Sequence, residues 1–95
     1  MFKYKRGIRL SYLKQGFVYF YCANFGSLPK STKHEIQKLC DEVAGKDSAA
    51  LLCLLTKPER TAVAVSMNYF VPEKRLYSLR ARFYEEFWRR RVFEK

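Results

Sequence analysis

The residue types that usually carry catalysis or bind metals are few and widely spaced in this sequence. His34 is the only histidine, and polar residues surround it. Cys22, Cys40 and Cys53 lie eighteen and thirteen residues apart, so they form neither a CxxC pair nor a zinc-binding spacing. There is also no glycine-rich phosphate loop and no carboxylate pair suited to acid–base chemistry. We therefore expect no enzyme activity, no metal site and no cofactor, and we expect the cysteines to be buried free thiols.

Basic side chains are the more informative group. The 95 residues include 19 lysines and arginines against nine acidic residues, a formal net charge of +10. Residues 1–14 hold five basic and no acidic side chains, and residues 69–95 hold eight basic and four acidic ones. Such charge is typical of proteins that bind a polyanion, because neutralised phosphates release condensed counterions. The same charge could instead serve only to keep the protein soluble.

The N-terminal part of the chain has the composition of β-strands. Residues 8–13 and 17–21 are rich in β-branched and aromatic side chains, and they flank Lys14-Gln15-Gly16. Gly16 can adopt the positive φ that a bulged hairpin loop requires. The pattern predicts a short β-hairpin, in which residues 1–14 are either its first strand or a basic arm.

A helical period follows the predicted hairpin. Apolar residues three or four apart predict a helix over residues 28–44 that ends at Gly45, because glycine is common just after a helix. Ser27 could cap this helix, or Thr32 could form a capping box with Glu35.

Two further helices are expected in the middle of the chain. Residues 49–55 are almost all apolar, which is typical of a helix in the centre of a core, and Asp47 or Ser48 could cap it. Thr56 and Glu59 have the spacing of a capping box and predict the start of the next helix.

Pro72 should separate that helix from the last one, because proline disfavours the helical conformation in the residue before it but suits the first helical position. The last helix is predicted to run to about Val92, with a wide apolar face. The sequence thus predicts a mainly α single domain over residues 1–95, a compact bundle of about four helices whose core is formed by residues 16–95. The expected core stripe of the last helix is Leu76, Leu79, Phe83 and Phe87.

The corner before the last helix has the spacing of a helix-turn-helix motif. Val65 and Ser66 supply an apolar and a small residue on the inner side of the first helix. Val71 is the apolar turn residue, and Leu76 and Leu79 are the packing positions of the second helix. Here the sequence resembles helix-turn-helix proteins, which implies binding to duplex DNA and regulation of transcription.

Three residues at the corner depart from that pattern. Phe70 stands where helix-turn-helix proteins usually have glycine, and Pro72 stands where a capping serine or threonine is common. Glu73 favours the helix dipole but would repel a nearby phosphate.

A looser resemblance extends over residues 16–88. The aromatic run at 16–20, a helix ending at Gly45 and the run Phe-Tyr-Glu-Glu-Phe at 83–87 occur in this order. In these features the chain is similar to small helical proteins of Gram-positive phages and mobile elements, which suggests a regulator from such a source.

The helix-turn-helix resemblance assigns roles to exposed polar residues. Side chains on the first turns of the last helix would reach base edges or phosphates, those further along would contact phosphates, and the basic N-terminal residues would follow the backbone or the minor groove. The expected nucleic-acid-binding residues are Lys74, Arg75, Tyr77, Ser78, Arg82, Arg89, Lys3, Lys5, Arg6 and Arg9.

Other partners fit the composition as well. Aromatic residues beside arginines are favoured at protein interfaces, so the chain could be an anti-CRISPR-like inhibitor that binds a host nucleic-acid-processing protein. An RNA-binding module that stacks bases on N-terminal tyrosines and phenylalanines is a third interpretation. The chain could also form a homodimer through its aromatic face and Val92-Phe93. The aromatic residues expected to be exposed are Tyr4, Tyr12, Tyr19, Trp88 and Phe93.

No apolar run approaches the roughly 20 residues that a membrane span needs. The basic N-terminus lacks the uninterrupted apolar stretch and cleavage pattern of a signal peptide. We therefore expect a cytoplasmic protein with no membrane partner.

Overall fold

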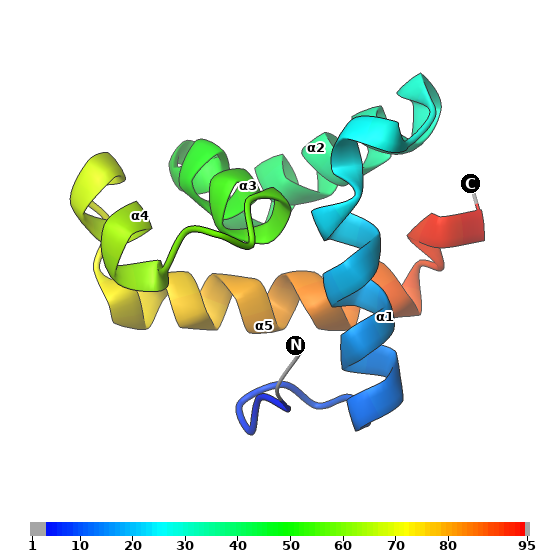
Figure 1. Cartoon of the computed structure of the whole chain (residues 1–95), viewed down its shortest axis with the longest axis horizontal. Coiled ribbons are helices and arrows are strands. Elements are labelled where there is room, and N and C mark those ends of the chain that lie inside the picture. Colours follow the sequence, from blue (N-terminus) through cyan, green and yellow to red (C-terminus); the bar gives the residue numbers. More distant parts are fainter. Residues whose placement is uncertain (1–3, 95) are drawn as a thin grey trace.

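The computed structural model describes residues 4–94, and within that range it contains five α-helices, three short 3-10 turns and no β-strand. Helix α5 runs along one side of the molecule and contacts each of the other four helices (Figure 1). The predicted mainly α bundle is therefore confirmed for these residues. The helices are α1 (Tyr12–Ala23), α2 (Lys30–Ala44), α3 (Ser48–Thr56), α4 (Ala62–Tyr69) and α5 (Glu73–Arg89).

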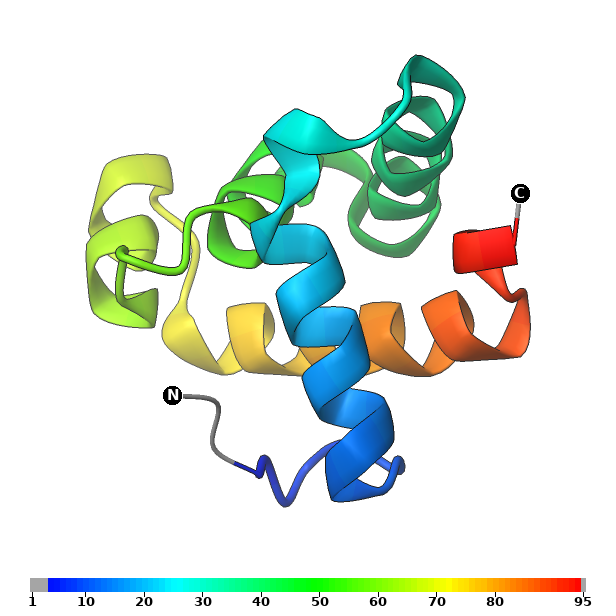
Figure 2. The ribbon, with the colours of Figure 1, turned by 45° about the vertical axis from the view of Figure 1, so that its right-hand side comes forward.

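The predicted N-terminal hairpin is wrong, because its second strand and loop form helix α1 instead. Ser11 caps this helix, accepting a hydrogen bond from the backbone N–H of Lys14 at 3.3 Å. Gln15, Val18 and Cys22, spaced three and four residues apart, are all buried on one face. Burial of that face against the rest of the domain outweighs the β-propensity of the aromatic residues, since packing commonly overrides local preference. Figure 2 shows α1 crossing α5.

Gln15 anchors the segment that precedes α1. Its fully buried side-chain amide donates to the carbonyls of Lys5 and Leu10 at 3.0 Å and of Ile8 at 3.3 Å, and its oxygen accepts from the Lys5 N–H at 2.8 Å. Ile8 is itself buried in the core. Residues 5–10 are therefore a loop bound to the helical body, neither a strand nor a detached arm.

Helix α2 has the predicted C-terminus but not the predicted N-terminus. Gly45, with a φ of 55°, follows the helix as expected. At the other end Pro29 occupies the N-cap position, so α2 begins at Lys30. Neither Ser27 nor Thr32 caps it, and the Thr32 side chain is buried.

The predicted capping box at Thr56 is also wrong. Helix α3 continues through Thr56, whose hydroxyl donates to the carbonyl of Leu52 at 2.7 Å. Helix α4 starts six residues later, at Ala62, and its N-cap is Thr61, whose hydroxyl accepts from the Ala64 N–H at 3.1 Å. Asp47 precedes α3 as predicted, but its side chain makes no capping hydrogen bond.

The core consists of two adjoining clusters along α5. The larger one joins α1, α2, α3 and α5 from Leu79 onward, and the smaller one lies where α3, α4 and the start of α5 meet. The predicted stripe on α5 is confirmed, since all four of its residues are buried. The smaller cluster consists of Ala50, Cys53, Val65, Val71 and Leu76.

All three cysteines are buried free thiols, as predicted. Burial raises the pKa of the Cys22 thiol and raises that of Cys40 to about 12. Among residues 4–94, no helix has the length and hydropathy that crossing a bilayer requires.

Candidate nucleic-acid interface

The corner between α4 and α5 consists of three residues, Phe70, Val71 and Pro72. Helices α3, α4 and α5 pack against one another around the smaller core cluster. The apolar positions of the predicted helix-turn-helix pattern, Val65, Val71, Leu76 and Leu79, are buried, and Ser66 is half-buried. The pattern therefore describes how these helices pack.

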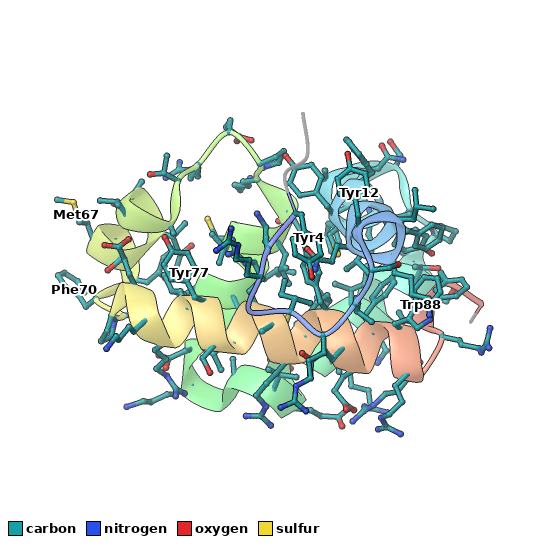
Figure 3. The ribbon with its side chains drawn as sticks, turned by 90° about the horizontal axis from the view of Figure 1, so that it is seen from below. Tyr4, Tyr12, Met67, Phe70, Tyr77 and Trp88 are labelled. Atoms are coloured by element: carbon teal, nitrogen blue, oxygen red, sulfur yellow. The ribbon has the colours of Figure 1, made fainter. Side chains whose placement is uncertain are left out.

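Phe70 adopts the backbone conformation that glycine usually provides in such a turn. Its φ of 57° and ψ of 43° place it in the left-handed region, which costs an L-residue roughly 1–2 kcal/mol. Its side chain is 92% exposed, so burial of the ring does not offset that cost. Figure 3 shows Phe70 and the exposed Met67 at the same end of the molecule. A strained, exposed aromatic residue is a candidate for contact with a ligand.

The first turns of α5 present side chains of two kinds. Lys74, Ser78 and Arg82 are exposed and make no side-chain hydrogen bond or ion pair with other described residues. The Nε atom of Arg75 instead donates to the carboxylate of Asp47. Arg75 therefore ties α5 to the turn before α3 and is not a free basic side chain.

Tyr77 is 44% exposed and already has two neighbours. Its hydroxyl donates to the Glu73 carboxylate at 3.4 Å, and the guanidinium carbon of Arg80 lies 5.0 Å from the centre of its ring. Tyr77 therefore forms a polar cluster with Glu73 and Arg80 on the side of α5 that faces α4 (Figure 3). It is also one of the residues predicted to bind nucleic acid.

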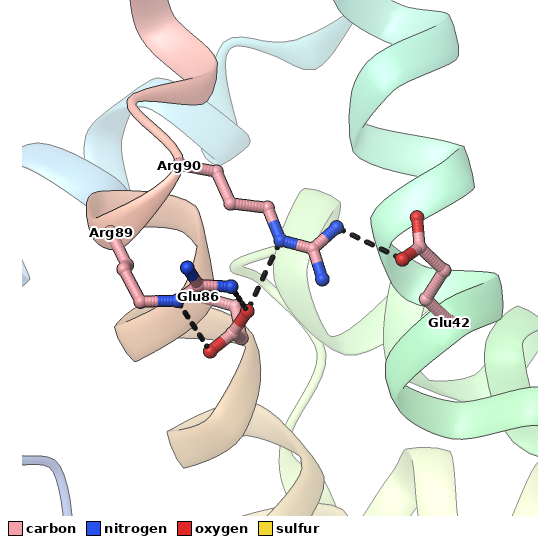
Figure 4. Close-up of polar contacts among 4 residues, drawn as sticks. All are labelled: Glu42, Glu86, Arg89 and Arg90. Atoms are coloured by element: carbon pink, nitrogen blue, oxygen red, sulfur yellow. Dashed lines mark hydrogen bonds and ion pairs between the residues drawn. The ribbon is translucent and has the colours of Figure 1, made fainter.

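Arg89 lies far from the corner, about 22 Å along α5 from Lys74 at 1.5 Å per residue. It donates to Glu86 at 2.6 and 3.1 Å, and Arg90 bridges Glu86 to Glu42 of α2 (Figure 4). The hydrogen bond from Arg89 is the main reason why the pKa of Glu86 is lowered. These residues form an acidic–basic network that is separate from the corner.

The N-terminal basic residues that were predicted to bind nucleic acid do not lie together at one site. Lys3 lies outside the described residues. Arg6 and Arg9 have exposed side chains, but the backbone N–H of Arg9 donates to the Glu85 carboxylate at 3.0 Å. This bond holds the N-terminal loop against α5.

A second basic surface lies beside the corner and was not predicted. Lys5, Arg60 and Arg80 line a cleft of about 390 Å³ bounded by α5, the loop between α3 and α4, α1 and the N-terminal loop. No aspartate or glutamate is among the described residues that line it. The cleft also contains the side chains of Tyr19, Tyr77 and Tyr84.

Arg80 is the unusual residue of this cleft. Its Nε atom is buried and has no hydrogen-bond partner among the described residues, and burial lowers the pKa of its guanidinium. A signal was present in the sequence, because Arg80 falls on the apolar side of α5, four residues after Leu76 and three before Phe83.

No family model, curated protein or solved structure matches this chain. His34 is exposed, and the described residues contain no cluster of histidine, cysteine and carboxylate side chains able to hold a metal ion.

An apolar groove on α1 is a further feature that the hairpin prediction concealed. The groove has a volume of about 600 Å³ and is lined mainly by Tyr12, Leu13, Phe17 and Phe20. Leu13 is 79% exposed and Phe20 is 57% exposed, both on one side of the helix.

Five aromatic residues were expected to be exposed, and only two of them are exposed in the structure. Tyr4 and Tyr12 are exposed, whereas Trp88 and Phe93 are half-buried and have ring centres 5.7 and 5.0 Å from that of Phe17. The remaining residue of that set, Tyr19, is also half-buried. Val92 is buried, so the predicted dimer contact through Val92 does not fit this surface.

Proposed function

We propose that this chain is a small DNA-binding protein of helix-turn-helix type, in which the first turns of α5 enter the major groove of duplex DNA. The observation that carries the proposal is the three-helix unit of α3, α4 and α5, which buries the motif's apolar positions and leaves Lys74 and Ser78 unpaired on its outside. The major groove admits a helix, and recognition helices read bases through their N-terminal residues.

Individual residues would then have different roles. Lys74 and Ser78 would contact base edges or phosphates, and Arg82, one turn after Ser78, would contact a phosphate. Arg75 would orient α5 through Asp47. Phe70 and Met67 would offer apolar contacts beside the helix, such as a thymine methyl group accepts. A regulator carried by a phage or mobile element is the biological role that we propose for this activity.

The test compares two double variants of equal charge. Lys74→Ala with Arg82→Ala removes two basic side chains from the proposed interface, and Lys30→Ala with Lys38→Ala removes two exposed ones from α2. Fluorescence anisotropy with mixed-sequence duplexes at several salt concentrations gives the affinity and its salt dependence.

We expect the first variant to bind more weakly and to reduce the slope of log K against log salt by about 2, since each phosphate contact contributes about 0.9. The α2 variant should retain most of the slope. Equal losses in both variants would mean that net charge alone attracts DNA, and absence of any salt-sensitive duplex binding would refute the proposal. Competition with single-stranded RNA in the same assay separates the RNA-binding alternative.

The apolar groove on α1 favours a second candidate, an inhibitor that binds a host nucleic-acid-processing protein. Tyr12, Phe17 and Phe20 lie exposed together along this groove, and aromatic residues are enriched where proteins bind partners. Leu13→Asp with Phe20→Asp should abolish capture of such a partner, whereas Lys74→Ala with Arg82→Ala should leave capture intact. The opposite pattern would place the partner at the corner and would contradict this candidate.

A further inference from the structure

Three basic side chains meet in the cleft beside α5 without a carboxylate among its lining residues. Arg60 comes from the loop between α3 and α4, Arg80 from α5, and Lys5 from the N-terminal loop that Gln15 anchors. The Glu73 carboxylate accepts from the Tyr77 hydroxyl at 3.4 Å and does not line the cleft. Positive charge is therefore concentrated at this cleft.

Among these basic residues, Arg80 indicates most clearly that the cleft binds an anion. More than nine in ten buried polar groups in folded proteins have a hydrogen-bond partner, and a buried arginine is usually paired with an anion. The Nε–H of Arg80 is buried without a partner among the described residues, and the guanidinium packs on the face of Tyr77. Arg80 as a whole is only half-buried and lines the open cleft, so an acceptor that enters from solvent would meet its guanidinium there.

We propose that this cleft is a binding site for the phosphate group of an organic phosphate. A planar guanidinium presents its donors in a fixed fork that matches phosphate oxygens, so Arg80 would bind two of them. Arg60 and Lys5 would supply the remaining positive charge from the two loops that line the cleft.

The surrounding groups are suited to the same ligand. Thr61 and Ala62, where α4 begins, line the cleft, and the N-terminal end of a helix carries partial positive charge. Burial raises the pKa of the Tyr84 hydroxyl, so that group keeps its proton and can donate to an anion. The pKa of Lys5 is lowered by burial and by the charge of Arg80, two effects that a bound anion would counteract.

The size of the cleft indicates more than a bare anion. Its volume of about 390 Å³ falls in the range of small-molecule sites, roughly 300–1,000 Å³. A phosphate ester therefore fits better than inorganic phosphate alone. The same phosphate chemistry could come from a free nucleotide or from the backbone of a polynucleotide, and the experiment distinguishes these two sources.

The experiment measures binding of pyrophosphate, adenosine monophosphate and a short single-stranded oligonucleotide by calorimetry at constant ionic strength. The variants are Arg60→Ala, on an exposed loop, and Arg80→Lys, which keeps the charge but loses the fork. Arg82→Ala is the matched control, because Arg82 is an exposed arginine on the same helix that does not line the cleft. Circular dichroism confirms that each variant is folded.

We expect the wild type to bind pyrophosphate, and each of the two cleft variants to weaken that binding about tenfold, as loss of one charge-assisted hydrogen bond would. Arg82→Ala should not change it. Tighter binding of adenosine monophosphate than of the oligonucleotide would assign the site to a free nucleotide, and the reverse to a polynucleotide backbone. The proposal would be overturned if none of the three probes bound, or if the wild type and Arg60→Ala bound pyrophosphate equally well.

This inference does not depend on the proposed binding of duplex DNA. The Lys74→Ala, Arg82→Ala double variant should still bind pyrophosphate, and Arg60→Ala should still recognise a duplex through the corner. The two proposals can therefore fail separately.

Discussion

Replacing Phe70 with glycine should stabilise the protein. At φ 57° and ψ 43° the phenylalanine pays roughly 1–2 kcal/mol for the left-handed conformation, which glycine adopts without steric cost. Glycine loses more backbone entropy on folding, which returns about 0.5–1 kcal/mol of that gain. The ring is 92% exposed, so removing it sacrifices little buried surface. The net expectation is a gain of about 0.5–1 kcal/mol in the free energy of unfolding.

Urea unfolding followed by circular dichroism measures this difference. For a domain of this size the gain corresponds to a rise in Tm of about 2–8 °C. Met67→Gly is the control, because Met67 is also exposed but lies within α4, where glycine should destabilise by about 1 kcal/mol. A Phe70→Gly variant less stable than the wild type would refute the assignment of strain to this turn. If the strain serves ligand contact, the stabilised variant should bind duplex DNA more weakly.

Three further predictions concern the body of the domain. Gln15→Met should lower the free energy of unfolding by about 2–4 kcal/mol, because it leaves backbone groups of residues 5–10 without their partner, and limited proteolysis should then cut that loop first. The lowered pKa of Glu86 contributes stability that is present above its ordinary pKa of 4.5 and is lost as the pH falls further, so Glu86→Gln should flatten the acid limb of a stability–pH curve. Cys22 and Cys40, with their raised pKa values and full burial, should react with a thiol reagent only as fast as the fold opens, and reaction at the rate of a free thiol would contradict their burial.

The helices that follow residue 28 could be predicted because their buried faces contain mostly apolar residues at helical spacing. Helix α1 could not, because its buried face includes the polar Gln15 while Leu13 and Phe20 point to solvent. That arrangement hides the helical period and leaves β-propensity as the only local signal. The choice between Thr56 and Thr61 as helix cap depends on where α3 stops packing, which no local pattern specifies.

At the candidate site, too, features set by local sequence could be predicted, whereas features set by contacts between distant residues could not. The exposure of Lys74 and Ser78 follows from the period of α5, so it was predictable. The engagement of Arg75 was not, because its partner Asp47 lies 28 residues away in the sequence. Arg80 is a basic residue at an apolar position of the helix, a signal that the sequence interpretation missed, and the cleft that explains it needs distant segments to come together.

The place of α5 in the chain order constrains how the protein can be made. Each of the other helices packs on α5, and both core clusters include its residues. A nascent chain that has released only residues 1–70 therefore lacks the helix on which the other four pack, although α3 can already contact α1, α2 and α4. Both core clusters therefore stay incomplete until α5, including Phe87, has left the exit tunnel.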